Sequence, residues 1–438
     1  MSPPSIEVRE KPSRRAILSR GESFWAVAAI GLLAAATNAA ASPLYRVYQL
    51  QFRFSAATLT LLFAVYVVVL LVTLVFLGSA SDYLGRRPVM LAALALGAVA
   101  CGLFLLAHGV GLLFAGRALQ GVAVGLISGT ASAALLDLRP ESGVTPVVSS
   151  AAPTGGQALG AIGASAMAQY APAPTHLVWW LLVAAFLIGI VALLGMPEPG
   201  RARPGVVSSL RPHVTVPPGA RGAFAVAVPA LVGVWALAGF YLSLGPSLAL
   251  QLLHSKNLLW GGVLIFLLTG LGAAASAAVA RKSAAGVMLG GCVTLIVGAV
   301  VTFASIATGA PAVLFVGTAV AGLGFGSAFV GAYRVTVAQA ASDDRAGLIT
   351  AIYLVSYLAT GIPAVIGGIA TSHFGLHKTA LVYSVAVAVL AAAAVSLLIR
   401  QMAHGRARRV GHHPDVPPGP GTVPPCPPTS PRLREAST

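Results

Sequence analysis

The stretch GSASDYLGRRP, Gly78–Pro88, is a short polar loop between two long apolar runs. It holds one acid, Asp82, which is followed by the basic pair Arg86 and Arg87. The runs on either side have about the 20 residues that cross a hydrocarbon core about 30 Å thick. The loop is therefore predicted to lie at a membrane surface, between two membrane-spanning helices.

Composition extends this interpretation to the whole chain. Of its 438 residues, 57% are hydrophobic and only 9% are charged, and the mean hydropathy is +0.88. A soluble domain carries about 25% charged residues, so a soluble enzyme is excluded. Three widely spaced cysteines exclude a disulfide scaffold and predict no metal site. The net charge of +16 comes from basic residues between apolar runs, which is typical of membrane topology and argues against a nucleic-acid partner.

Twelve apolar runs are predicted to be helices that span a lipid bilayer. They are 24–41, 58–78, 88–107, 110–135, 145–168, 177–196, 223–250, 259–279, 284–308, 311–333, 347–371 and 378–399. Membrane strands are excluded, because a strand needs only about ten residues of alternating polarity and these runs are apolar on every face. Helices also satisfy their own backbone hydrogen bonds in lipid.

Lysine and arginine are distributed unequally between the two sides of the predicted membrane. Of 27 such residues, 22 fall on the side of the N-terminus, four on the other side, and Arg117 within a span. Positive residues concentrate on the cytoplasmic side. Both termini are therefore expected in the cytoplasm, in a multi-pass protein of the plasma (inner) membrane.

Polar segments divide the chain into five expected parts. The central segment is rich in Pro, Arg and Ser and suits a flexible linker. The Pro-rich C-terminal segment has no apolar periodicity and is expected to be disordered. The parts are a cytoplasmic tail (1–22), an N-terminal six-helix bundle (23–196), a cytoplasmic linker (197–221), a C-terminal six-helix bundle (222–400) and a cytoplasmic tail (401–438).

An internal repeat indicates two equivalent halves. LLFAGRALQGVAVG at Leu112–Gly125 and VLFVGTAVAGLGFG at Val313–Gly326 are identical at six of 14 positions, in the fourth and tenth predicted spans. Two repeated six-helix halves are the arrangement of many secondary transporters. The expected fold is an all-α integral membrane protein with 12 transmembrane helices in two pseudo-symmetric six-helix bundles.

Two motifs resemble those of the major facilitator superfamily. The family's loop signature, Gly-x-x-x-Asp-Arg/Lys-x-Gly-Arg-Arg/Lys, is matched by Gly78, Asp82, Gly85, Arg86 and Arg87, with Tyr83 in place of a basic residue. The family's fourth-span motif, Arg-x-x-Gln-Gly, is matched by Arg117, Gln120 and Gly121. The resemblance covers about residues 23–400. It implies a 12-helix transporter whose cavity lies between spans 1, 4, 7 and 10.

The five matching loop residues are predicted to form a conformational latch. Gly78 would let two helices approach closely, and Gly85 would allow a tight turn. Asp82 could pair with the nearby arginines or bind a neighbouring helix N-terminus. Such a cluster could hold the two halves together in one state and release them in another; the alternative is a plain basic turn.

Arg117 is the only charge well inside a predicted span, roughly 10 Å below the outer surface. A charge at that depth normally faces a bundle interior or an aqueous cavity. Amide and aromatic residues on other spans are candidates to line that cavity or to couple transport, with helix packing as the alternative. The predicted set is Asn38, Tyr66, Arg117, Gln120, Gly121, Gln157, Trp235, Tyr241, Tyr353 and Tyr357.

Over the whole chain the sequence resembles bacterial drug and metabolite efflux members of this family. The predicted function is therefore secondary active export of a small neutral or anionic organic molecule by alternating access. No acid lies in mid-membrane, so Arg117 would make the cavity positive. If protons drive transport, Asp82 or Asp137 at the inner mouth is the predicted proton site. The alternative is uptake of a sugar or other metabolite. An integral-membrane enzyme is disfavoured because no catalytic constellation lies in the spans. No cofactor is expected. The protein is expected to be a monomer.

Overall fold

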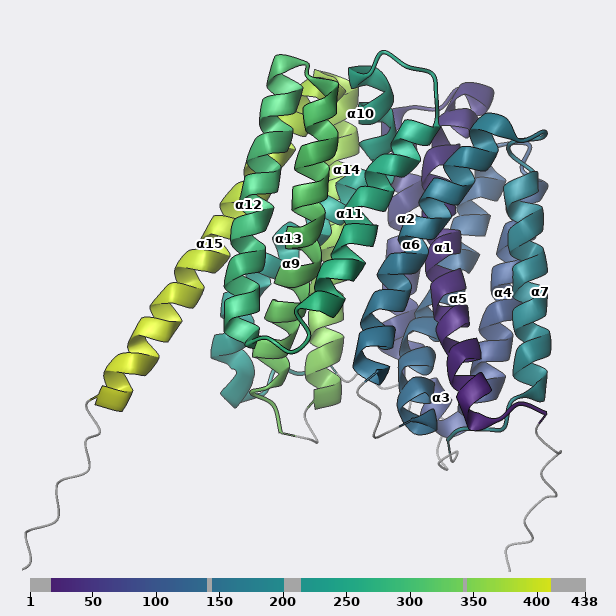
Figure 1. The fold of residues 1–438 in the computed structure, drawn as a ribbon. Helices are drawn as coiled ribbons and strands as arrows, with labels where there is room; N and C mark the ends of the chain where they lie inside the picture. The colour runs from purple at the N-terminus through teal and green to yellow at the C-terminus, as the bar shows by residue number, and fades with distance from the viewer. Residues whose placement is uncertain (1–16, 140–143, 201–213, 342–344, 411–438) are drawn as a thin grey trace, which may run out of the picture. The chain divides into compact units, whose positions relative to one another are not determined.

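The computed structural model describes residues 17–139, 144–200, 214–341 and 345–410, and these are almost entirely helical, with no strand among them (Figure 1). The helices are α1 (Arg20–Phe52), α2 (Ala56–Leu77), α3 (Ala80–Leu84), α4 (Arg86–Leu105), α5 (Val110–Leu138), α6 (Thr145–Tyr170), α7 (Leu177–Gly195), the 3-10 helix η1 (Pro218–Ala220), α9 (Arg221–Ser243), α10 (Gly245–Leu252), α11 (Leu259–Ala278), α12 (Ala284–Thr308), α13 (Pro311–Val337), α14 (Arg345–Phe374) and α15 (Leu376–Val410). The described residues up to Leu398 form one compact unit, and the described residues from Ile399 onward are assigned to a second.

The predicted tails and linker lie partly outside the described residues. Of the N-terminal tail, only residues from Ile17 onward are described, and α1 already begins at Arg20. The centre of the predicted linker is not described. The C-terminal segment differs from the expectation at its start, because α15 continues to Val410, ten residues into the segment predicted to be disordered.

Eleven helices among the described residues are long and apolar enough to cross a membrane, and their positions match eleven of the twelve predicted spans. The remaining predicted span, 145–168, is α6, a 26-residue helix. Its length suffices, but its many Gly, Ala and Ser residues give it a lower hydropathy than the others. It nevertheless packs between α1 and α11, so the prediction of twelve long membrane helices agrees with the fold.

Small residues let α6 pack closely against α1. A Cβ atom at Gly156 would overlap the backbone of Leu32, and one at Gly160 would overlap the backbone of Ala36. Glycine removes the side chain that would otherwise keep the two backbones apart. In lipid, such close packing replaces the hydrophobic effect as the force that joins helices.

Glycines of the internal repeat make the same kind of helix contact in both halves. A Cβ at Gly121 would lie 2.7 Å from the carbonyl oxygen of Tyr66, so this face of α5 touches α2. A Cβ at Gly322 would lie 2.6 Å from the carbonyl oxygen of Leu267, so the same face of α13 touches α11. Because α2 and α11 are the second and eighth predicted spans, the repeated sequence makes equivalent contacts in two pseudo-symmetric halves.

Two predicted spans differ from the structure at places that involve a proline. The first, 24–41, is part of a helix that passes through Pro43 and ends at Phe52. The seventh, 223–250, is interrupted at Leu244, which separates α9 from α10. Pro246 has no N–H to donate to the preceding turn, so it is accommodated in the first turn of a new helix.

The two halves meet through α6 with α11 and through α2 with α14. Following the predicted orientation, the inner end of the helices is the one that carries α3, and the outer end is the one that carries α10 (Figure 1). Near the outer end, Gly262 of α11 lies against Ser165 of α6, and Gly368 of α14 lies against Thr60 of α2. The halves are thus in close contact at their outer ends.

Candidate functional site

Arg117 lies on α5 and is completely buried, with 0% of its surface exposed. Seven residues separate it from Val110 at the start of α5, which is about 10 Å of helix. Its Nη1 donates to Oδ1 of Asn38 at 3.2 Å and to Oε1 of Gln120 at 2.6 Å. The Gln120 amide nitrogen donates in turn to the carbonyl of Thr37 at 3.0 Å. Two predicted residues, Asn38 and Gln120, therefore hold the guanidinium with their amide oxygens.

Three aromatic rings surround the Arg117 guanidinium. Its Cζ atom lies 4.9 Å from the ring centroid of Tyr66, 5.2 Å from that of Tyr45 and 6.0 Å from that of Phe63. Cation–π attraction of this kind strengthens where water is excluded. Tyr66 belongs to the predicted set, whereas Tyr45 lies beyond the predicted end of its span and Phe63 resembles any apolar residue of a membrane helix.

No acid neutralises this charge within the described part of the chain. The described acids are Glu22, Asp82, Asp137 and Glu198, all at the inner end. Neither Nε nor Nη2 of Arg117 has a hydrogen-bond partner among the described residues. A buried donor left without a partner costs about 1–3 kcal/mol, and more when it is charged. These N–H groups can bind an oxygen of a ligand, and no three His, Cys, Asp or Glu side chains of the described segments gather to hold a metal.

A cluster of aromatic rings lies in the C-terminal half, around Trp235 of α9. The Trp235 ring makes edge contacts with Phe325 at 5.9 Å and Phe329 at 5.3 Å, and lies 5.9 Å from Tyr357. Tyr353 stacks on Tyr357 at 6.2 Å. The indole Nε1 is buried and has no hydrogen-bond partner in the described structure. Trp235, Tyr353 and Tyr357 were predicted; the two phenylalanines carry no polar signal and were not.

The two clusters adjoin where the halves meet. Tyr357 of α14 packs against the hydrophobic core of the N-terminal half and lines a surface groove together with Val67 and Val68 of α2. We define the cationic pole as Asn38, Tyr45, Phe63, Tyr66, Arg117 and Gln120, and the aromatic pole as Trp235, Phe325, Phe329, Tyr353 and Tyr357. The candidate site therefore has a charged end on one half and an aromatic end on the other.

Three predicted cavity residues lie outside both poles. Gly121 faces the α2 backbone, where it is a packing residue and not a cavity residue. The Tyr241 hydroxyl lies 3.0 Å from Oγ1 of Thr318, a buried contact between α9 and α13 within the C-terminal half. Gln157 is half-buried on α6, and no hydrogen bond joins it to either pole among the described residues. For Gly121 and Tyr241, helix packing is the better interpretation.

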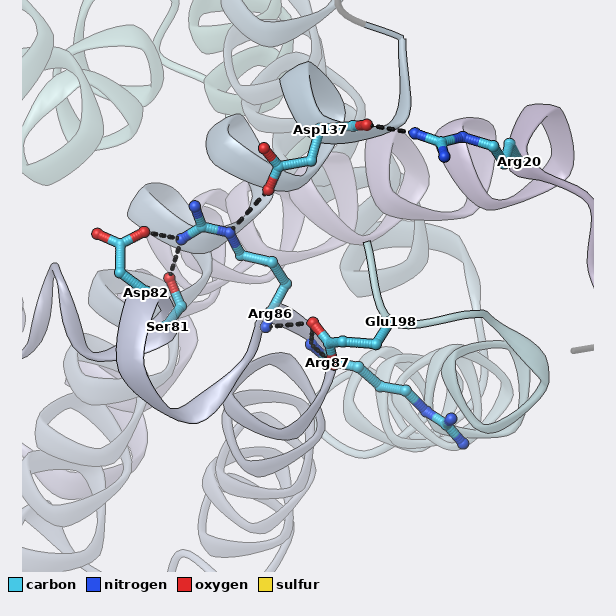
Figure 2. A network of polar contacts seen from close by, with 7 residues as sticks. All are labelled: Arg20, Ser81, Asp82, Arg86, Arg87, Asp137 and Glu198. Carbon is cyan, nitrogen blue, oxygen red and sulfur yellow. Dashed lines mark hydrogen bonds and ion pairs between the residues drawn. The ribbon is translucent and has the colours of Figure 1, made fainter. Parts of the chain in front are cut away.

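The charged residues of the predicted latch, Asp82, Arg86 and Arg87, lie on α3 and in the first turn of α4, as Figure 2 shows. Gly78 lies at the end of α2, and Gly85 lies between α3 and α4. Nη1 of Arg86 forms an ion pair with Oδ1 of Asp82 and donates to Oγ of Ser81 at 2.7 Å. Nε of Arg86 forms a second ion pair, at 3.0 Å, with Oδ2 of Asp137. Arg86 thus fastens the loop to the inner end of α5.

Glu198, just after α7, binds the first turn of α4 (Figure 2). Its carboxylate accepts from the backbone N–H of Arg86 at 2.6 Å and from that of Arg87 at 3.2 Å. A negative group is favourable there because of the helix dipole. Asp82, a sequence candidate for a helix N-terminus, pairs with the Arg86 side chain instead. The Arg87 side chain donates to the carbonyl of Leu194 on α7.

The two glycines of the loop differ in their surroundings. Gly85 has φ +94°, which L-residues rarely adopt, and a Cβ there would lie 3.1 Å from Oε2 of Glu198. Gly78 lies where α2 approaches α5, because a Cβ at Gly129 would lie 3.1 Å from the Gly78 carbonyl oxygen. A larger residue at Gly85 would disturb the turn, and one at Gly78 would meet the carbonyl of Leu74 in the last turn of α2.

Arg20 of α1 completes the network by donating to the backbone carbonyl of Asp137 at 2.6 Å (Figure 2). All partners in the network belong to α1, α3, α4, α5 and the end of α7. The loop therefore ties helices of the N-terminal half together. The predicted latch would also contact the C-terminal half, and no such contact is among those described in this conformation. Glu198 was not predicted, because 112 residues separate it from Arg86 in sequence.

Comparison with known proteins identifies the family. The sequence model described as Major Facilitator Superfamily matches residues 27–306, well over half of the chain. The chain belongs to the major facilitator superfamily. The matched region contains both sequence motifs and the whole cationic pole. No curated protein matches the chain.

Solved structures of transporters share the fold. A bacterial homologue of the human lysosomal transporter Spinster, in an inward-facing and occupied conformation, gives a TM-score of 0.69 at 13% identity, covering 89% of this chain and 97% of that one. The nucleoside transporter NupG gives 0.64 at 12% identity, covering 85% and 98%. The human organic anion transporter MFSD10 (TETRAN) gives 0.63 at 18% identity, covering 89% and 100%.

As a major facilitator protein with this fold, the chain is a multi-pass membrane protein built as a transporter. The resemblance in sequence implied a cavity between spans 1, 4, 7 and 10, which are α1, α5, α9 and α13. The two poles use side chains from these four helices and from α2 and α14. The candidate site therefore lies between the two halves, where a transported molecule would contact both.

Proposed function

We propose that this protein exports a small neutral or anionic organic molecule by alternating access. The proposal rests on Arg117, which is a fully buried cation. Its Nε and Nη2 have no hydrogen-bond partner among the described residues, and no described acid lies beside it. Arginine stays protonated in essentially any protein environment. A ligand oxygen bearing negative charge would satisfy both nitrogens at once.

The same charge disfavours cations. Two like charges 4–8 Å apart at an effective dielectric near 20 repel by about 2–4 kcal/mol. That is more than tenfold in binding. A neutral molecule escapes this penalty, and an anion gains from the same charge. MFSD10 is named an organic anion transporter, but at 18% identity the likeness is one of fold, so the argument rests on Arg117.

The aromatic pole suits the other end of the substrate. Its rings give a large apolar surface, and the unpartnered Nε1 of Trp235 offers one hydrogen-bond donor. A lipophilic molecule with one anionic or carbonyl group could place that group at Arg117 and its apolar body against Trp235. Because the poles belong to different halves, such a molecule would link the halves and could favour the closed state.

Alternating access requires the halves to separate at one end at a time. The described contacts between halves include Gly262 with Ser165 and Gly368 with Thr60, both near the outer end. We propose that these contacts open when the outer end opens. The bundles at 23–196 and 222–400 would then move as the two bodies, joined by the linker 197–221.

The proposed topology follows from the charge distribution. Basic residues at the inner end support cytoplasmic termini and insertion in the plasma membrane. Export is the proposed direction because the sequence resembles drug-efflux branches of the family; uptake of a sugar or other metabolite is the alternative. We propose a monomer as the working unit, since the two poles come from one chain.

Proton coupling is a separate part of the proposal. Asp82 and Asp137 are the candidate proton sites; both pair with Arg86, and their side chains are 39% and 33% exposed. If protons drive export, the double variant Asp82→Asn, Asp137→Asn should lose pH-gradient-driven flux. Robust pH-driven export by that double variant would exclude both acids.

Flux into proteoliposomes tests the function as a whole. Purified protein is reconstituted, and uptake of radiolabelled aromatic carboxylates is followed with and without an imposed pH gradient. We expect saturable flux that competing carboxylates inhibit. Flux that stays proportional to concentration, or chemical conversion of the compound, would contradict a transporter.

A further inference from the structure

A groove opens on the surface of the C-terminal half between α9, α14 and α15. Its volume is about 580 Å³, and the residues that line it are apolar except for Lys378, Thr379 and Tyr383. No residue of either pole lines it, so it is separate from the candidate transport site. We propose that this groove binds an acyl chain of an anionic phospholipid whose phosphate is held by Lys378.

The length of the groove along α15 matches the thickness of the hydrocarbon layer of one leaflet. Along α15 the lining runs from Lys378 near the outer end to Leu390, twelve residues or about 18 Å of helix. Half of a hydrocarbon core about 30 Å thick is about 15 Å. A lipid with its headgroup at Lys378 could therefore lay an acyl chain along the whole groove. In the proposed topology this lipid belongs to the outer leaflet.

The width of the groove favours a lipid chain over a helix. A volume of about 580 Å³ over about 18 Å leaves a cross-section of only about 30 Å². An α-helix with its side chains is about 10–12 Å across. A helix of a second copy could lie only over the open side of the groove, whereas an extended hydrocarbon chain would fit within it.

Local packing keeps the groove from closing. Gly367 and Ala370 of α14 line it without bulky side chains. The Tyr383 ring is fixed beside it, because its hydroxyl donates to the carbonyl of Ala236 at 2.8 Å and its ring lies 4.6 Å from that of Phe240. Tyr383 is therefore not available to swing into the groove and fill it.

Charge at the mouth selects the headgroup. Lys378 is exposed and makes no ion pair among the described residues. His377 precedes Lys378 in the sequence and is exposed, and its ring can donate a hydrogen bond to a phosphate. The described acids all lie at the inner end, so none repels an anionic headgroup here. One lysine near the membrane surface increases the affinity for an anionic lipid by about fivefold.

Competitive lipid binding tests the proposal. The purified protein is placed in detergent micelles containing equal amounts of phosphatidylglycerol and phosphatidylcholine, and retained lipids are counted by native mass spectrometry. Lys378→Gln should lower the preference for phosphatidylglycerol about fivefold. Lys256→Gln removes another exposed outer lysine, away from the groove, and should leave the preference unchanged. Equal preference in the two variants would overturn the proposal.

A groove-filling variant locates the chain. Ala370→Phe places a ring in the groove and should abolish labelling of α14 and α15 by a phosphatidylglycerol that carries a photoreactive acyl chain. The unmodified protein should be labelled within residues 363–390. Labelling elsewhere only, or undiminished labelling of Ala370→Phe, would contradict the assignment, as would a dimer that forms in place of lipid binding.

Discussion

Asp82 shows how one side chain at the membrane surface could control transport. Its partner Arg86 also holds Asp137, so the loop and α5 share one guanidinium. Asp82→Asn removes the charge and keeps the size, and an exposed ion pair contributes only about 0–1 kcal/mol to stability. We expect normal membrane insertion and a nearly unchanged melting temperature, with substrate flux reduced at least tenfold.

The control for this prediction is another acid of the same network. Glu198→Gln keeps an oxygen at the α4 N-terminus, so it should weaken the network less than Asp82→Asn does. Flux in both variants is measured on equal amounts of correctly inserted protein. Near-normal flux in Asp82→Asn would show that its charge does not act in the cycle.

At the residue scale, the sequence was informative where a residue was unusual for its surroundings. Arg117 is a lone charge in an apolar span, and Asn38 and Gln120 are the nearby amides that it binds. Phe63 was missed because it is ordinary in a membrane helix, and Glu198 was missed because its partners lie on another helix. Contacts between distant segments depend on helix packing, and no local pattern records them.

At the scale of elements, α6 is held in place by backbone contact more than by hydropathy. Gly160 and Gly163 are three residues apart on this helix, but a Cβ at Gly160 would overlap the backbone of Ala36, whereas nothing lies within 4 Å of one at Gly163. We expect Gly160→Ala to destabilise the folded protein by about 1–3 kcal/mol. Gly163→Ala should have little effect, and melting temperatures in detergent compare the two.

A reversed or equal effect of the two alanines would show that α6 does not pack as described.

The same helix shows which features of the elements could be predicted from the sequence. Its position was predicted from a run without charges, but its close partner α1 was not. Element ends were predicted less well, as at Pro43 and Pro246, because proline is compatible with the interior of one helix and with the start of another.

At the scale of the molecule, the contacts at the outer end should open during each cycle. Nδ2 of Asn257 donates to the Tyr170 hydroxyl at 3.1 Å, and these residues belong to different halves. In the double variant Tyr170→Cys, Asn257→Cys, a short cleavable thiol cross-linker should stop flux, and cleavage should restore it. Each single variant treated in the same way serves as the control. Undiminished flux with complete cross-linking would contradict opening at this end.

The two-half architecture was predictable from the sequence because three signals agreed. The apolar runs indicated the helices, the loop and fourth-span motifs indicated the family, and the repeat at Leu112–Gly125 and Val313–Gly326 indicated the symmetry. Which residues of the two halves meet was not predictable. It depends on contacts such as that of Gly262 with Ser165, between helices far apart in the chain.

The proposal that Arg117 selects neutral or anionic substrates is tested most directly by the charge preference of transport. Three aromatic compounds matched in size, one a carboxylate, one a neutral amide and one an amine, compete for flux in proteoliposomes that contain the wild-type protein, Arg117→Lys or Arg117→Gln. We predict that the carboxylate and the amide compete at least tenfold better than the amine, that Arg117→Lys keeps this order, and that Arg117→Gln weakens the carboxylate most. A preference for the amine that Arg117→Gln leaves unchanged would contradict the proposal.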